Sequence, residues 1–271
     1  MKRAKGVLAN LLTVLFTLSA FLLAGFIAVI VPATSNSFYK SQFRKHGTLE
    51  KVRAQSAYID DADAKNYVAN MTEEQLLSLM NHTMRYCLYL EDDLNIEKDG
   101  KRLEIFLDER GEPLDSGCLE VTHMSDVKKL FGAGVIICIV AAVVFVTTLI
   151  LGEISKDIRR RKPCRFKKEY YLYCRKTVFV TLGVCLAVLA VIGVTAAINF
   201  DFAFTLFHEI FFSGKQWRFG YGVMINMIGE IFTGIVPIIA AIWIVLLVIT
   251  VAGAALFNKK ISSPKNAPPR P

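Results

Sequence analysis

Hydrophobic residues along the chain fall into four long stretches, separated by mostly polar segments. The stretches cover residues 6–31, 131–151, 177–198 and 232–257. A helix needs about 20 consecutive apolar residues to cross a bilayer, and each stretch is long enough. The pattern therefore predicts four transmembrane helices. The fourth contains Pro237, which a membrane helix tolerates when neighbouring groups satisfy the freed carbonyl.

The first stretch follows three basic residues, as the core of a signal peptide would. That core is only about 7–15 residues long, whereas the stretch here has 26 residues and no clear cleavage site of small residues. We therefore interpret residues 1–31 as a short tail and a membrane anchor.

Residues 32–130 carry short helix and strand patterns. A capping box from Thr72 to Gln75 predicts the start of a helix, and apolar residues recur at helical spacing up to about Leu90. The runs Leu103–Leu107 and Cys118–Val121 resemble strands, with turn residues between them. We expect a small α+β region with a helix and a hairpin.

The entry to the second stretch is polar. We expect Ser125 or Asp126 to cap that helix, because an acidic group is favourable at the positive end of a helix. His123 would then lie just before the helix, near the membrane surface.

Residues 199–231 are too apolar for a solvated loop, because six phenylalanines occur in the thirteen residues 200–212. We predict a helix that lies in the membrane interface and presents these rings to acyl chains. Asp201 and His208 are seven residues apart and therefore share one face of that helix. Trp217 and Tyr221 follow as expected interfacial anchors.

Composition supports a membrane protein: 54% of the residues are hydrophobic and 21% are charged, against about 45–50% and 25% in soluble domains. The expected fold is thus an α-helical integral membrane protein with four transmembrane helices, a small α+β region between the first two, and an interfacial helix between the last two.

The net charge of +8 is unevenly distributed. The N-terminal tail, residues 152–176 and the tail 258–271 are basic, whereas residues 33–130 hold 18 acidic and 13 basic residues. Basic loops remain in the cytoplasm, so both termini and the 152–176 loop are expected inside, and residues 32–130 and 199–231 outside. The basic residues then act as topology signals with some attraction to anionic lipid, which argues against a nucleic-acid partner. The Pro-rich tail is expected to be disordered.

Six cysteines are scattered along the chain without a CxxC pair, which argues against a zinc ribbon or a thioredoxin-like site. Cys87 and Cys118 both lie in the segment expected outside the membrane. They could form a disulfide, and the sequence leaves this open.

Four histidines are candidates for chemistry. His46 and His82 fit surface roles, whereas the expected topology brings His123 and His208 to one membrane level. A histidine there can act as a general base, a nucleophile or an oxyanion donor. The HExxH motif is absent. Zinc held by the two histidines with an aspartate is possible in principle, but the spacing does not demand it.

Glu230 is an acid at the expected outer start of the fourth span. Such a residue is a functional candidate, and it can equally serve as the acidic first turn of a helix. Both interpretations stay open.

Two segments carry a family resemblance, residues 121–128 and residues 199–212 followed by Trp217. The second has the pattern FDxAFxxFHxIFF. It resembles the lipoprotein intramolecular transacylases, which are four-span enzymes of Gram-positive bacteria, and the layout matches over almost the whole chain. The motif histidines of that family fall on His123 and His208. The sequence departs from the family at Gly222 and Gly229, where an acidic residue and a proline are frequent, and in a longer 33–130 segment.

The resemblance implies an enzyme without metal or cofactor. Its substrate would be a lipoprotein whose N-terminal cysteine carries a diacylglyceryl group, and the sn-2 acyl chain would move to the cysteine α-amine. His123 and His208 would be catalytic, with the division of roles open. The residues expected to support them are Asp126, Asp201, Trp217 and Glu230.

Two alternative functions are a membrane scaffold or sensor and a metalloprotease. A non-catalytic four-span scaffold or sensor would need a cytoplasmic output module, for which the expected inner loop of about 25 residues is short. A metalloprotease would lose activity on treatment with a strong chelator. The sequence gives no oligomeric state.

Overall fold

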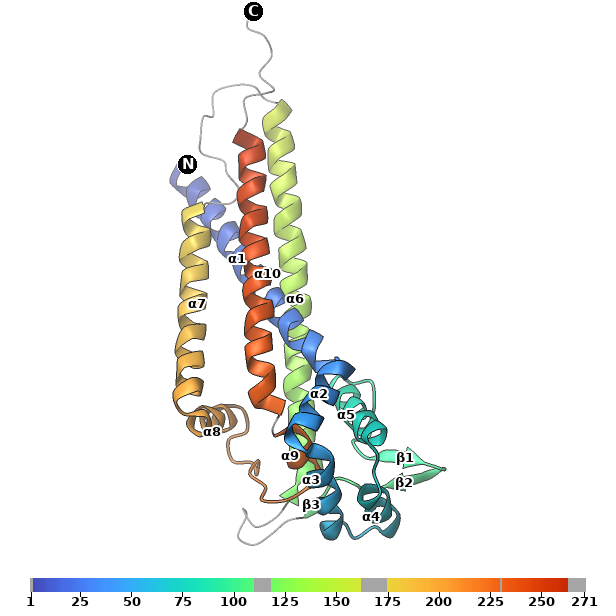
Figure 1. The fold of residues 1–271 in the computed structure, drawn as a ribbon. Coiled ribbons are helices and arrows are strands. Elements are labelled where there is room, and N and C mark those ends of the chain that lie inside the picture. The colour runs from blue at the N-terminus through green and yellow to red at the C-terminus, as the bar shows by residue number, and fades with distance from the viewer. Residues whose placement is uncertain (1, 110–117, 162–174, 230, 263–271) are drawn as a thin grey trace, which may run out of the picture. The chain divides into compact units, whose positions relative to one another are not determined.

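The computed structural model describes residues 2–109, 118–161, 175–229 and 231–262, which are mostly helical (Figure 1). Glu230, most of the basic 152–176 loop and the Pro-rich tail from residue 263 lie outside the described residues. Contacts divide the chain into two compact units. One comprises Met1–Ile27, Ile137–Ile198 and Ala241–Pro271, and the other comprises Ala28–Ile136 and Asn199–Ala240.

The first unit is formed by parts of four long helices. These are α1 (Lys2–Ala33), α6 (Glu120–Arg161), α7 (Arg175–Ile198) and α10 (Ile231–Ser262). Three of them contain segments long and apolar enough to cross a membrane, namely Val7–Ala33, Glu120–Leu151 and Lys176–Ile198. In α10 the described apolar segment is shorter, Gly234–Thr250. The first three predicted spans are thus long apolar helices, and the fourth stretch is helical.

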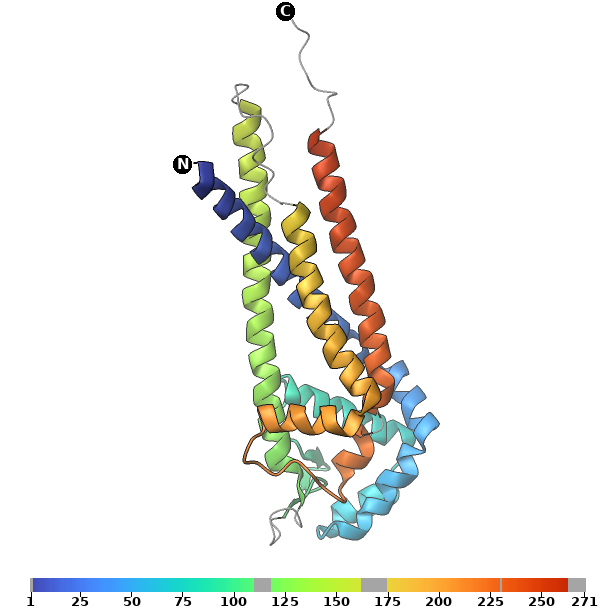
Figure 2. The same ribbon diagram turned by 90° about the vertical axis from the view of Figure 1, so that its left-hand side faces the viewer.

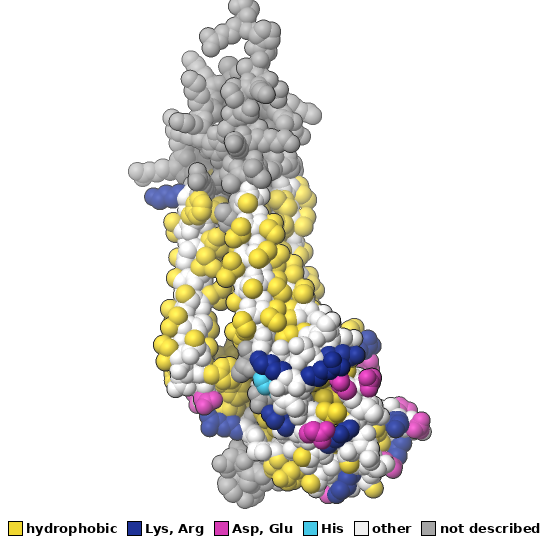
Figure 3. Space-filling model, in the orientation of Figure 1, with side chains coloured by type: hydrophobic (Ala, Val, Ile, Leu, Met, Phe, Trp, Pro, Cys, Tyr) yellow, Lys and Arg dark blue, Asp and Glu magenta, His cyan; other side chains and the backbone are white. Residues whose placement is uncertain are grey.

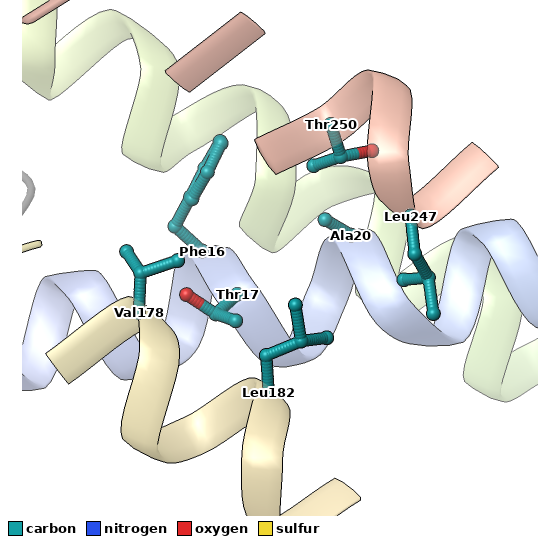
Figure 4. A pocket seen from close by; sticks show the side chains of 7 residues that line it. All are labelled: Phe16, Thr17, Ala20, Val178, Leu182, Leu247 and Thr250. Atoms are coloured by element: carbon teal, nitrogen blue, oxygen red, sulfur yellow. The ribbon is translucent and has the colours of Figure 1, made fainter. Parts of the chain in front are cut away.

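Side chains within the first unit pack closely. The indole Nε1 of Trp243 donates to the carbonyl oxygen of Phe21 at 3.1 Å, and the ring covers Gly25 so tightly that a Cβ there would lie 2.8 Å from it. Among α1, α7 and α10 remains a cavity of about 10 Å³ (Figure 4). That volume holds about one water-sized probe, so it cannot take an acyl chain.

The second unit combines short helices with two small hairpins. Its helices are α2 (Asn36–His46), α3 (Thr48–Ala54), the 3₁₀ helix η1 (Gln55–Tyr58), α4 (Ala62–Ala69), α5 (Glu73–Cys87), α8 (Phe200–Phe211) and α9 (Val223–Ile228). Its buried core includes Tyr39, Leu76, Ile105 and Met227. On the face shown in Figure 3, charged side chains are interspersed with hydrophobic and other side chains.

The helix predicted from the capping box is confirmed as α5. Thr72 Oγ1 accepts from the Gln75 N–H, and the Gln75 side chain accepts from the Thr72 N–H. The helix ends at Cys87 and not at Leu90. Tyr89 adopts a left-handed backbone (φ 60°), and this conformation ends helices.

The predicted hairpin between Leu103–Leu107 and Cys118–Val121 is wrong in detail. Most of the first run is not a strand, because the side-chain oxygen of Asn95 accepts the N–H groups of Ile105 and Phe106, at 2.8 and 2.9 Å, which removes these donors from a ladder. The observed pair joins β3 (Asp108–Glu109) to β4 (Cys118–Leu119), and the turn between them lies outside the described residues.

A second hairpin was missed. Strand β1 (Ile96–Lys98) pairs with β2 (Lys101–Leu103) around Asp99 and Gly100, whose φ angles are 53° and 75°. An Asp-Gly pair with two positive φ angles is a strong signal for a tight hairpin, so the sequence did contain the information.

The predicted cap of the second span is also wrong. Helix α6 begins at Glu120, so Ser125 and Asp126 lie inside it and His123 is in its first turn rather than before it. The Asp108 carboxylate accepts the N–H and the hydroxyl of Thr122, both at 3.1 Å. A residue of strand β3 therefore satisfies an N-terminal donor of the helix, which a local capping pattern does not reveal.

Candidate active site

The Phe-rich segment is helical, as predicted. Helix α8 covers Phe200–Phe211, and the Asn199 side chain caps it by accepting the Phe202 N–H at 3.0 Å. One side of the helix is apolar and exposed, for example at Phe202 and Ile210, whereas His208 is buried. This helix therefore directs its histidine into the protein.

Helix α8 runs crosswise to α6, with one end near α6 (Figure 2), and this end brings two histidines together. The ring centroids of His123 and His208 are 5.9 Å apart, with the planes inclined by 25°. Each residue is only 7% exposed, although 85 positions separate them in the sequence. The structure thus joins the two histidines that the sequence singled out.

Aromatic rings surround this pair. Phe212 meets His123 edge-on at 5.0 Å, and Phe204 lies 4.0 Å from the His208 ring. Trp217 stacks on His208, with ring centroids 4.5 Å apart and planes inclined by 29°. The rings hold both imidazoles in place and shield them from water.

The protonation of His208 follows from one hydrogen bond. Its Nδ1 lies 2.7 Å from the carbonyl oxygen of Phe204. A carbonyl oxygen only accepts, so Nδ1 carries the hydrogen and Nε2 of the neutral ring holds a free electron pair. Burial lowers the pKa of His208 below its ordinary value, which keeps the ring neutral and able to accept a proton near neutral pH.

Comparison with known proteins shows to which family the chain belongs. The family model described as lipoprotein intramolecular transacylase Lit matches residues 11–233, most of the chain and both histidines. The chain belongs to the Lit family. No curated protein and no solved structure matches it. Membership indicates a membrane protein that carries out lipoprotein intramolecular transacylation.

Of the supporting residues predicted for this Lit family member, Trp217 lies in the site and Asp126 lies beside it. Asp126 is one helical turn beyond His123, and its Oδ1 accepts from Lys129 at 3.0 Å and from Lys215 at 2.8 Å. Lys215 follows α8 in sequence. The ion pair therefore links the helix that carries His123 to the segment that follows His208.

The structure does not bring Asp201 into the site. The residue is exposed, and no contact between its side chain and His208 occurs among the described residues. Spacing correctly placed both on one helix, but His208 turns inward and Asp201 remains at the surface. Glu230 lies outside the described residues.

Sequence reasoning missed several residues around the Lit histidines. Phe219 meets His123 edge-on at 5.7 Å, and Phe212 is almost fully buried although it belongs to the run expected to face acyl chains. Glu120, one turn before His123, is completely buried. The only sequence signal for these residues was their nearness to the two motifs.

Cysteine and metal chemistry are not evident in the described parts of this Lit family member. Cys87 and Cys118 are buried free thiols, and burial raises the pKa of Cys87 to about 12. The described residues contain no group of three or more His, Cys, Asp or Glu side chains that could hold a metal ion.

Proposed function

We propose that the protein moves the sn-2 acyl chain of a diacylglyceryl-cysteine lipoprotein to the cysteine α-amine, with His123 and His208 as the catalytic pair. The observation that carries this proposal is the pairing of two buried histidines from α6 and α8 in a chain of the Lit family. The product would be a lyso-form lipoprotein with an N-acyl cysteine and a free sn-2 hydroxyl.

The free electron pair on Nε2 suits His208 to the role of general base. After the α-ammonium loses one proton to solvent, the neutral amine attacks the carbonyl carbon of the sn-2 ester. The Nε2 atom takes the second proton from the attacking nitrogen, and then returns it to the sn-2 oxygen as the ester C–O bond breaks. The proton balance closes without a further reactant.

His123 is suited to donate a hydrogen bond to the oxyanion that forms on the ester carbonyl. Its ring lies parallel to that of His208 in a shielded environment, where a fixed donor stabilises developing charge more effectively than water does. Donor and acceptor of the acyl group belong to one molecule, so proximity supplies much of the acceleration.

The exposed side of α8 suits the lipid part of the substrate. Phe200, Phe202 and Phe211 are 40–55% exposed, whereas Phe204 and Phe212 pack on the histidines. We place this helix at the outer face of the bacterial cell membrane, with four spans and both termini cytoplasmic. The outward rings would contact the acyl chains while the inward rings hold the catalytic pair.

The test uses the purified full-length protein and a synthetic diacylated lipopeptide, with the product identified by mass spectrometry. His208→Asn retains a donor for the Phe204 carbonyl but removes the Nε2 base, and His123→Ala removes the proposed oxyanion donor. Each is expected to reduce the rate on the order of 10²–10⁴-fold. The control is His82→Asn, because His82 contacts the Asp93 carbonyl at 2.9 Å and lies outside the site. Normal product from both site variants would refute the proposal.

A further inference from the structure

A buried carboxylate lies one helical turn before His123. Glu120 is fully buried, and it accepts hydrogen bonds from two distant parts of the backbone. Its Oε2 accepts the Leu107 N–H at 3.0 Å and its Oε1 accepts the Met224 N–H at 2.6 Å. Burying a carboxylate is costly unless such donors compensate it, so a glutamate at this position calls for an explanation.

The backbone that Glu120 holds has an unusual conformation. Gly222 has φ 119° and ψ 159°, a region that is essentially restricted to glycine. A Cβ at this glycine would lie 2.4 Å from the Glu120 Oε1. The missing side chain is therefore what allows the carboxylate to approach the backbone at residues 222–224.

Other groups fix the same turn. The Gly222 N–H donates to the Gln55 side chain at 2.9 Å, and the Cys118 thiol donates to the Tyr221 carbonyl at 3.3 Å. The rings of Tyr58 and Tyr221 lie 4.8 Å apart. Residues 221–224 are thus held by contacts with several residues, and the Glu120 carboxylate is one of them.

The position of this turn connects it to the catalytic pair. Residues 212–222 run from the end of α8 to the turn, and they carry Trp217, which stacks on His208, and Lys215, which bonds Asp126. Glu120 and His123 share the first turn of α6. One carboxylate therefore links the helix of His123 to the far end of the segment that packs on His208.

We propose that Glu120 is a positioning residue, which fixes the geometry of the His123–His208 pair by holding the turn at Gly222. The inference rests on the proposed function for its catalytic consequence. A displacement of about 1 Å in a reacting group can reduce a rate on the order of 100-fold. Loss of the carboxylate is therefore expected to lower kcat and to leave KM nearly unchanged, because Glu120 itself is buried and does not reach the substrate.

The experiment compares Glu120→Gln with Glu97→Gln, which changes an exposed glutamate of β1. Glutamine keeps the size of the side chain but presents an amide donor where one backbone N–H needs an acceptor. Kinetics on the lipopeptide are combined with NMR of the ¹⁵N-histidine-labelled full-length protein, whose four imidazoles include two outside the site.

In Glu120→Gln we expect the signals of His123 and His208 to shift, those of His46 and His82 to stay, and kcat to fall on the order of 10- to 100-fold with KM changed less than about twofold. Site signals that match the wild type, or equal shifts at all four histidines, would overturn the proposal. If Glu120→Gln does not fold, Gln55→Met is used instead, because it removes a weaker contact to the same turn. Signals of His123 and His208 that match the wild type in Gln55→Met would also overturn the proposal. A wild-type protein that forms no product would refute the proposed function alone, because the NMR comparison does not depend on turnover.

Discussion

The indole of Trp217 stacks on the imidazole of His208, with ring centroids 4.5 Å apart and planes inclined by 29°. The contact joins the segment after α8 back to the buried face of that helix. It leaves the Nδ1 of His208 bonded to the Phe204 carbonyl. The imidazole is therefore held both by the stacked indole and by a hydrogen bond. A base that is held in this way is already oriented, so little orientational entropy is lost on reaching the transition state.

The first prediction concerns this stack. Trp217→Leu removes the flat surface and is expected to lower kcat by about tenfold, whereas Trp217→Phe retains a ring and should lower it much less, since aromatic pairs contribute about 0.5–1.5 kcal/mol beyond their buried area. The measurement is lipopeptide turnover with equal amounts of folded protein. Equal activity of the leucine and phenylalanine variants would contradict a role for stacking.

The second prediction concerns pH. The pKa of His208 is lowered by burial from its ordinary value of 6.5, so the base remains neutral to lower pH than a free imidazole. The NMR signals of the His208 imidazole in the free protein should therefore titrate with a midpoint below pH 6.5. The unfolded chain binds this proton first as pH falls, so the stabilising contribution of neutral His208 is present above 6.5 and is lost as pH falls through the folded pKa. Thermal unfolding of wild type and His208→Asn across this range checks the stability, and a His208 titration midpoint above 6.5 would contradict the assignment.

The third prediction concerns Arg218. Its guanidinium lies 4.6 Å from the Trp217 ring centroid and donates to the Thr205 hydroxyl at 2.9 Å, and its positive charge contributes to the lowered pKa of His208. Arg218→Gln removes this charge. The titration midpoint of His208, followed by NMR, should move to higher pH, while Arg85→Gln, which breaks an ion pair with Glu91 elsewhere, should leave it in place. A shift in the opposite direction would exclude this electrostatic effect.

The fourth prediction compares two glycines with positive φ. At Gly214 (φ 73°) an added Cβ meets nothing within 4 Å, so Gly214→Ala should cost only about 1 kcal/mol of backbone strain. At Gly222 the same change adds strain of about 1–3 kcal/mol and displaces the Glu120 carboxylate, whose hydrogen bonds contribute about 1.5–3 kcal/mol each. The drop in melting temperature of Gly222→Ala should be clearly the larger, and equal drops would contradict the close contact.

The fifth prediction concerns the thiols at Cys87 and Cys118. Both are buried and free, and burial keeps the Cys87 pKa at about 12, so neither should react with maleimide in the folded protein. Denaturant should expose both to labelling, and a reducing agent should change neither melting temperature nor activity. Labelling that requires prior reduction would show a disulfide instead.

Local interactions explain what the sequence by itself determined. Apolar runs of sufficient length predicted the long helices, the Thr72 capping box predicted the start of α5, and the Phe-rich run predicted the helix α8. The two histidines also stood out from the sequence. Each of these features depends on residues within a few positions of one another, where periodicity and capping act directly.

The tertiary structure decided what depends on distant partners. Helix α6 begins eleven residues before the apolar stretch, because the Asp108 carboxylate of β3 accepts the Thr122 N–H and the Glu120 carboxylate accepts the Met224 N–H. Only tertiary packing determined which phenylalanines contact the histidines and which stay exposed. It also left Asp201 outside the site. Helical spacing states which residues share a face, but only the neighbouring element determines which face is buried.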